Sequence, residues 1–270
     1  MRRLVVPLLG VILTAIGMQA QSNPFDALRN PGDPRLYEEH KAQWLARVEA
    51  LPKNVDVLEG AADFFIIRDR QLAQDLFERA RALEPNSPRW PSKLAQLHKL
   101  NAAQGDQSEA RLALAEMERA VAMTPTNERS LSTALAEMAF DAGDIPKARA
   151  YAEQLLDLAK VSPKSWDYGN AVYKGRLVLG RIAVREGRIV DAVGLLRASG
   201  ETLGSSQLIS SFGPNMSLAK DLLEHREIDA VLAYLEQCRV FWKMGGDKLD
   251  AWVQEVKAGR VPNFGANLHY

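Results

Sequence analysis

Apolar residues recur every three to four positions along most of this chain, which is the period of amphipathic α-helices. The clearest unit spans 54–87 and contains two such runs joined by a short polar turn. Small residues allow two helices to approach closely, large apolar residues fill the space beside them, and a proline ends the second helix. The residues that carry this pattern are Gly60, Ala61, Phe64, Ala73, Phe77, Ala80 and Pro85. They predict a helical hairpin.

Weaker copies of this unit follow at 88–127, 128–160, 170–198 and 216–243. A small residue near the start of each second helix aligns the copies, at Ala73, Ala113, Ala148, Ala192 and Ala230. The spacing between these alanines varies, so the repeat is degenerate. Because each hairpin alone leaves an apolar face uncovered, we expect the copies to stack into one cooperative unit.

The 54–87 unit resembles the tetratricopeptide repeat, a helix–turn–helix of about 34 residues. Val57 stands where that family usually has an aromatic residue. The resemblance implies an all-α, right-handed α-solenoid of helical hairpins. It also implies that the first helices of successive hairpins line a groove that takes peptides or partner helices.

The flanking segments predict additional helices. An amphipathic run over 34–51 is expected to cover the first hairpin, with Leu36, Trp44, Leu45, Val48 and Leu51 on its apolar side. Runs over 229–243 and 247–257 predict two helices at the other end, so the helical-repeat domain is expected to span 34–260. The segment 261–270 is turn-like and is expected to form a loosely held C-terminal tail.

The N-terminus has the pattern of a secretory signal peptide over residues 1–20. A basic start at Arg2-Arg3 is followed by the apolar run 4–16 and by small residues before Gln21. The run is shorter than the roughly 20 residues that span a bilayer, which predicts cleavage after Ala20 and no stable membrane span afterwards. An uncleaved anchor is the alternative. Residues 21–33 form an irregular leader, and the mature protein is expected to be periplasmic or secreted.

Charge and composition exclude several classes of function. The chain has 34 Lys+Arg and 34 Asp+Glu, which argues against binding nucleic acid through bulk electrostatics. The one cysteine, Cys238, allows no intrachain disulfide and lies in an apolar helical stripe, so it is expected to be buried. Metal-protease, nucleophile-elbow and phosphate-loop motifs are missing, so we expect no cofactor, no metal and no catalysis.

Charged residues on two predicted first helices are the leading candidates for binding a protein or peptide partner. Glu137 and Asp141 lie on one helix, and Lys174, Arg181 and Arg185 lie on another. The arginines, four residues apart, present a basic patch that suits a carboxylate or an acidic segment. The alternative is that these cations pair with Glu137, Asp141 or Glu186.

The long Ser/Gly-rich segment 199–215 departs from the repeat plan and holds two further candidates, Phe212 and Asn215. Leu208, Ile209 and Phe212 predict that part of it packs, and Asn215 is a candidate N-cap for the next helix. A rival interpretation is an exported helical enzyme with its site at this segment and the C-terminal helices. That site would use the polar residues Asn215, His225, Glu227 or Asp247.

Overall fold

The computed structural model describes residues 34–103, 105–124, 129–161, 168–201 and 212–268. The predicted signal peptide, the leader, and Leu208 and Ile209 therefore lie outside the described residues. Within these ranges the chain is all-helical, with twelve α-helices, two short 3-10 helices and no β-strand. No helix in them is long and apolar enough to cross a membrane.

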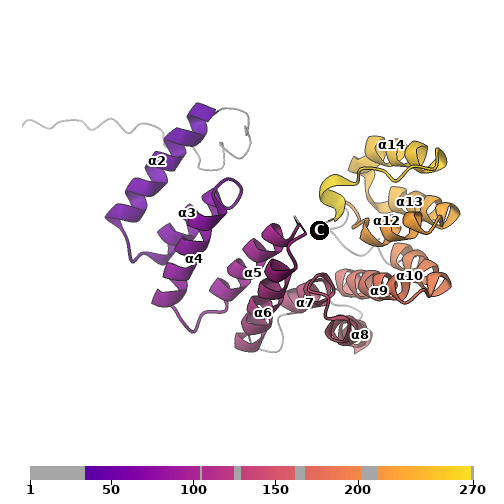
Figure 1. Cartoon of the computed structure of the whole chain (residues 1–270), viewed down its shortest axis with the longest axis horizontal. Coiled ribbons are helices and arrows are strands. Elements are labelled where there is room, and N and C mark those ends of the chain that lie inside the picture. The colour runs from indigo at the N-terminus through magenta and orange to yellow at the C-terminus, as the bar shows by residue number, and fades with distance from the viewer. Residues whose placement is uncertain (1–33, 104, 125–128, 162–167, 202–211, 269–270) are drawn as a thin grey trace, which may run out of the picture.

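The helices follow one another in chain order across the molecule (Figure 1). Each packs against its neighbour in sequence, and α9 also packs against both α7 and α12. Their bounds are α2 Pro34–Ala50, α3 Val55–Phe65, α4 Arg70–Leu83, α5 Arg89–Ala102, α6 Gln107–Met123, α7 Arg129–Asp141, α8 Ile145–Val161, α9 Tyr168–Arg185, α10 Ile189–Glu201, α12 Ser217–Glu224, α13 Ile228–Phe241 and α14 Gly246–Lys257. The 3-10 helices are η2 Lys243–Gly245 and η3 Gly265–Leu268. We call α3, α5, α7, α9 and α12 the first helices, and α4, α6, α8, α10 and α13 the second helices.

Each second helix buries three residues spaced at i, i+4 and i+7, which lie on one helix face. All fifteen are at most 2% exposed. The triads are Ala73-Phe77-Ala80, Ala113-Met117-Ala120, Ala148-Ala152-Leu155, Ala192-Leu196-Ser199 and Val231-Leu235-Cys238. The last triad corrects the expected register, because Val231 rather than Ala230 faces the core. Cys238 is buried, as predicted, and burial raises the pKa of its thiol.

The first helices carry a matching buried small residue. Ala61, Ala136, Gly180 and Ala219 each lie twelve residues before the first member of their triad. Only the second hairpin differs, because Ala95 lies eighteen residues before Ala113. The extra residues lengthen the end of α5 and the start of α6, because the connection between these helices, 103–106, is as short as the one between α3 and α4, 66–69.

Four of the hairpin turns place one residue in the left-handed region, and the turns of the third, fourth and fifth hairpins share one geometry. Gly143 and Gly187 have φ of 78° and 74°, and Arg226 has φ of 64° at the same position in the α12–α13 turn. In each of these three turns, the residue after the left-handed one donates its backbone N–H to the carbonyl five residues before it. Asp144 N donates to Ala139 O at 2.9 Å, and Glu227 N donates to Leu222 O at 3.0 Å. The shared turn geometry explains why these helix pairs keep the same twelve-residue spacing.

The N-terminal helix α2 covers α3, as expected, but with a partly different set of side chains. Tyr37 stacks on Phe64 with ring centroids 5.2 Å apart, and the indole of Trp44 lies directly over Gly60. Val48 is buried, whereas Leu45 and Leu51 are 41% and 50% exposed. Aromatic contacts on one side of α2 therefore replace the broader apolar stripe that its sequence predicts.

The C-terminal segment 261–268 is held firmly rather than loosely. Phe264 is buried with its ring edge-on to Trp252, at 5.1 Å between centroids. Asn267 is 2% exposed, its backbone oxygen accepts from Met216 N at 2.7 Å, and its side-chain Nδ2 donates to Pro214 O at 3.0 Å. These bonds attach the segment to the approach to α12, which is information that hydrophobic periodicity does not contain.

Candidate functional site: the pocket along the first helices

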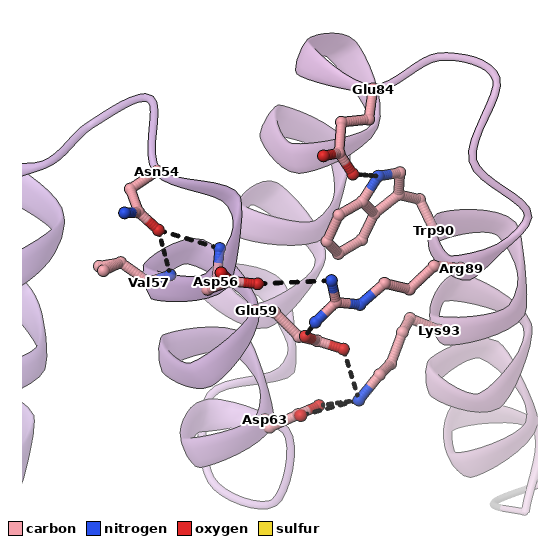
Figure 2. A network of polar contacts seen from close by, with 9 residues as sticks. All are labelled: Asn54, Asp56, Val57, Glu59, Asp63, Glu84, Arg89, Trp90 and Lys93. Carbon is pink, nitrogen blue, oxygen red and sulfur yellow. Dashed lines mark hydrogen bonds and ion pairs between the residues drawn. The ribbon is translucent and has the colours of Figure 1, made fainter.

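Ion pairs connect each first helix to the next. On α3, Glu59 and Asp63 face Lys93 of α5, whose Nζ lies 3.2 Å from Glu59 Oε1 and 2.7 Å from Asp63 Oδ2 (Figure 2). Arg89 of α5 also pairs with Glu59. The sign of charge alternates along the array, because α3 supplies acids here and α5 supplies bases.

Glu137 of α7 lies between two lysines from its neighbouring first helices. Lys99 Nζ of α5 is 3.3 Å from Glu137 Oε2, and Lys174 Nζ of α9 is 3.0 Å from Glu137 Oε1. Burial alone would raise the pKa of Glu137, but Lys174 and Lys99 outweigh it and hold that pKa below its usual range. Glu137 in turn raises the pKa of Lys99. The three charges form one compensated cluster.

Arg181 of α9 continues the connection to α12. Its Nε lies 2.9 Å from Asp221 Oδ2, and its Nη1 lies 3.6 Å from Asp141 Oδ1 on α7. The guanidinium also stacks over the buried ring of Phe140, 4.2 Å from its centroid. Two acids and one aromatic ring therefore fix its orientation.

Arg185, one turn later on α9, is placed differently. Its guanidinium lies 4.0 Å from the centroid of the same Phe140 ring. Within the described part of the chain no carboxylate pairs with it, and Glu186 pairs instead with Arg149 and Arg188. Arg185 is thus held in position by an aromatic ring, and no acidic side chain among the described residues compensates its charge.

These side chains surround a pocket of about 440 Å³, here called the central pocket. Its lining comes from the adjoining ends of α5 and α6 with the connection between them, and from α7, α9 and α12. Its lining residues are Lys99, Ala102, Ala103, Gly105, Asp106, Gln107, Ala110, Glu137, Asp141, Leu177, Val178, Arg181, Arg185, Asn215, Ser217, Lys220, Asp221 and Leu268. The central pocket therefore joins residues from four hairpins and the C-terminal segment.

The C-terminal segment completes the wall near α12. Leu268 lines the central pocket, and its backbone oxygen accepts from Ser217 Oγ at 3.0 Å. Asn215 is also buried there, with its backbone oxygen accepting from Tyr173 Oη at 3.0 Å. In Figure 1 the yellow C-terminal segment turns back from α14 toward the ends of α5 and α6.

The structure brings most of the predicted site residues together. Five of them line the central pocket, namely Glu137, Asp141, Arg181, Arg185 and Asn215. Lys174 does not line it but pairs with Glu137, which does. The expectation that the cations pair with nearby acids holds for Lys174 and Arg181, and Arg185 has no such partner in the described ranges.

The two candidates from the long segment behave differently from expectation. Phe212 is 58% exposed and lies outside the central pocket, whereas residues 213–215 directly after it are buried, so part of the segment packs without the Phe212 side chain. Helix α12 begins at Ser217, and Asn215 Oδ1 accepts from Ser217 N at 2.9 Å. Asn215 therefore organises the turn before α12 without capping the helix itself.

Of the polar residues in the rival enzyme interpretation, one lines the central pocket. Asn215 lines the central pocket, whereas His225, Glu227 and Asp247 are not among its lining residues. His225 and Asp247 are exposed, and Glu227 precedes α13. In the ranges that the structure describes, no group of three or more His, Cys, Asp and Glu side chains is placed to hold a metal ion.

Sequence reasoning missed four charged residues of this site: Lys99, Asp106, Lys220 and Asp221. A signal for one of them exists in the spacing from the buried small residue of each first helix. Lys220 directly follows Ala219, as Glu137 follows Ala136 and Arg181 follows Gly180. No protein-family model matches the chain, and no curated protein matches its sequence.

Proposed function

We propose that this chain is an exported, non-catalytic scaffold of tetratricopeptide-like hairpins that binds a protein or peptide partner in the central pocket. The observation that carries the proposal is Arg185, a positioned cation without a carboxylate partner in the described residues, at the wall of a pocket built from several first helices. Export is supported by the sequence pattern of residues 1–20.

The repeat geometry supports the family part of the proposal. Four of the five hairpins keep a twelve-residue spacing between two buried small positions, and all five second helices bury residues at i, i+4 and i+7. A right-handed solenoid built from such hairpins would present the first helices side by side on one surface. The ion pairs between successive first helices are consistent with that arrangement.

The test is affinity capture with the mature chain from Gln21, using the envelope fraction of the exporting cell and mass spectrometry of the retained proteins. Reversing both pocket arginines, Arg181→Glu with Arg185→Glu, is expected to abolish capture of the partner, because the pocket then repels an acidic group. Circular dichroism of the variant checks that the helical fold survives.

A matched control reverses two arginines on second helices, Arg111→Glu with Arg197→Glu. Both are exposed and lie outside the central pocket. The control is expected to retain the partner. If the pocket variant and the control capture it equally well, the central pocket is not the binding surface.

A further inference from the structure

Two departures from the regular hairpin plan contribute to the lining of the central pocket. One is the α5–α6 hairpin, whose helices are extended where they meet and whose connection contributes Ala103, Gly105 and Asp106. The other is the C-terminal segment, which contributes Leu268 and is anchored through the buried Asn267. A partner helix running the length of the first helices would meet both segments, so this geometry favours a ligand that fits inside the pocket.

The size of the central pocket agrees with that conclusion. Its volume of about 440 Å³ lies within the range of about 300–1,000 Å³ that is common for small-ligand pockets. Apolar side chains such as Leu177, Val178 and Leu268 share the lining with the charged groups. A compact ligand with some apolar surface and charged ends matches such a lining.

Two lining charges have no partner of opposite sign in the described residues, and they are of opposite sign to each other. Arg185 stands on α9, and Asp106 stands at the start of α6. Asp106 uses Oδ1 to accept from Ser108 N and Ser108 Oγ, at 2.8 and 2.6 Å, which leaves Oδ2 available. The other lining charges are paired. Lys99 pairs with Glu137, and Lys220 pairs with Glu224. Arg181 pairs with both Asp141 and Asp221.

We propose that the central pocket binds a short zwitterionic peptide, with its carboxylate on Arg185 and its ammonium group on Asp106. This inference rests on the proposed peptide-binding function and narrows it from a protein partner to a free oligopeptide. A simple anion would pair with Arg185, but Asp106 would gain no partner and would repel the anion. A ligand that carries both charges pairs with both Arg185 and Asp106.

The experiment is isothermal titration calorimetry of the mature chain with trialanine, N-acetyl-trialanine and trialanine amide. Unmodified trialanine is expected to bind most tightly. Blocking either end removes one charge-assisted hydrogen bond and weakens binding about tenfold. Equal binding of all three peptides overturns the proposal.

Charge-removing variants assign each end to its residue. Asp106→Asn keeps an N-cap residue at the start of α6, so the helix is retained while the charge is lost. This variant is expected to bind trialanine and N-acetyl-trialanine equally but still to discriminate against the amide. Arg185→Gln is expected to show the converse selectivity.

Asp144→Asn is the matched control, because Asp144 accepts from Lys147 N at the start of α8 and lies outside the central pocket. It is expected to bind all three peptides as the unaltered protein does, and an effect equal to that of Asp106→Asn contradicts the assignment.

If no tripeptide binds while reversal of Arg181 and Arg185 still abolishes partner capture, the zwitterion proposal fails and the proposed function stands. If neither binding nor capture is observed, both fail.

Discussion

Arg181 on α9 forms an ion pair with Asp221 on α12, forty residues later in the sequence, and this pair joins two first helices. Arg181 Nε lies 2.9 Å from Asp221 Oδ2. Both side chains are about one-quarter exposed, at 25% and 22%. Their contact connects the fourth and fifth hairpins at the wall of the central pocket. It therefore links the stability of the array to the shape of its candidate site.

A double-mutant cycle measures that link. Arg181→Gln and Asp221→Asn are expected to show a coupling free energy of about 0.5–1 kcal/mol in urea unfolding, because the pair is partly screened by solvent. The pair Arg181→Gln and Asp141→Asn serves as the comparison, since those charges lie 3.6 Å apart and Asp141 is 41% exposed. A larger coupling to Asp141 than to Asp221 would contradict the geometry.

Glu137→Gln tests the compensated cluster with its two lysines. Removing the carboxylate leaves two partly buried ammonium groups near each other, so the free energy of unfolding is expected to fall by about 2–3 kcal/mol at neutral pH. Chemical denaturation at pH 7 gives the value.

The same variant makes a pH prediction. Because Lys174 and Lys99 lower the pKa of Glu137 in the folded chain, its stabilisation is fully present above the unfolded-state pKa and is lost as the pH falls through the lower folded value. The difference in stability between the unaltered chain and Glu137→Gln should therefore shrink once the pH falls below the ordinary glutamate value of about 4.3. A constant difference down to pH 3 would show that the ion pairs are not its source.

Two helical glycines are expected to respond oppositely to leucine. A Cβ at Gly180 would lie 2.4 Å from Cδ2 of the fully buried Leu218, so Gly180→Leu is expected to destabilise the chain by about 1–3 kcal/mol. Gly194 has no atom within 4 Å of such a Cβ, so Gly194→Leu is expected to stabilise α10 by about 0.8 kcal/mol. Thermal unfolding of both variants tests whether α9 and α12 approach as closely as the hairpin spacing implies.

Asn267 tests the anchoring of the C-terminal segment. Asn267→Ala removes the donor to Phe212 O and Pro214 O, at 3.3 and 3.0 Å, and leaves the buried Pro214 carbonyl without it. The expected cost is about 2 kcal/mol. Asn263→Ala, in the same segment but exposed, is expected to cost less than half as much in the same urea titration. Similar losses in the two variants would mean that the segment is not held by Asn267.

The helices were largely predictable because their apolar spacing is local information. The alanines at 73, 113, 148 and 192 marked buried faces correctly, and the fifth alanine misled because Val231 and Leu235 define that face instead. The partners of Glu137 and Arg181 were not fully predictable, since Lys99 and Asp221 lie on neighbouring hairpins about forty residues away. Such contacts depend on how hairpins stack, and degenerate repeats with variable connections leave that register open. The anchoring of 261–268 was missed for a similar reason, because the backbone bond from Met216 N to Asn267 O has no counterpart in the side-chain pattern.

Site-specific photo-crosslinking tests the central claim most directly. Replacing Ala103, which lines the central pocket, with p-benzoylphenylalanine and irradiating the mature chain with its captured partner should give a covalent adduct. The same replacement at Leu112, which is 47% exposed on α6 outside the pocket, should give none. An adduct from position 112 alone, or equal adducts from both positions, would contradict a partner-binding role for the central pocket.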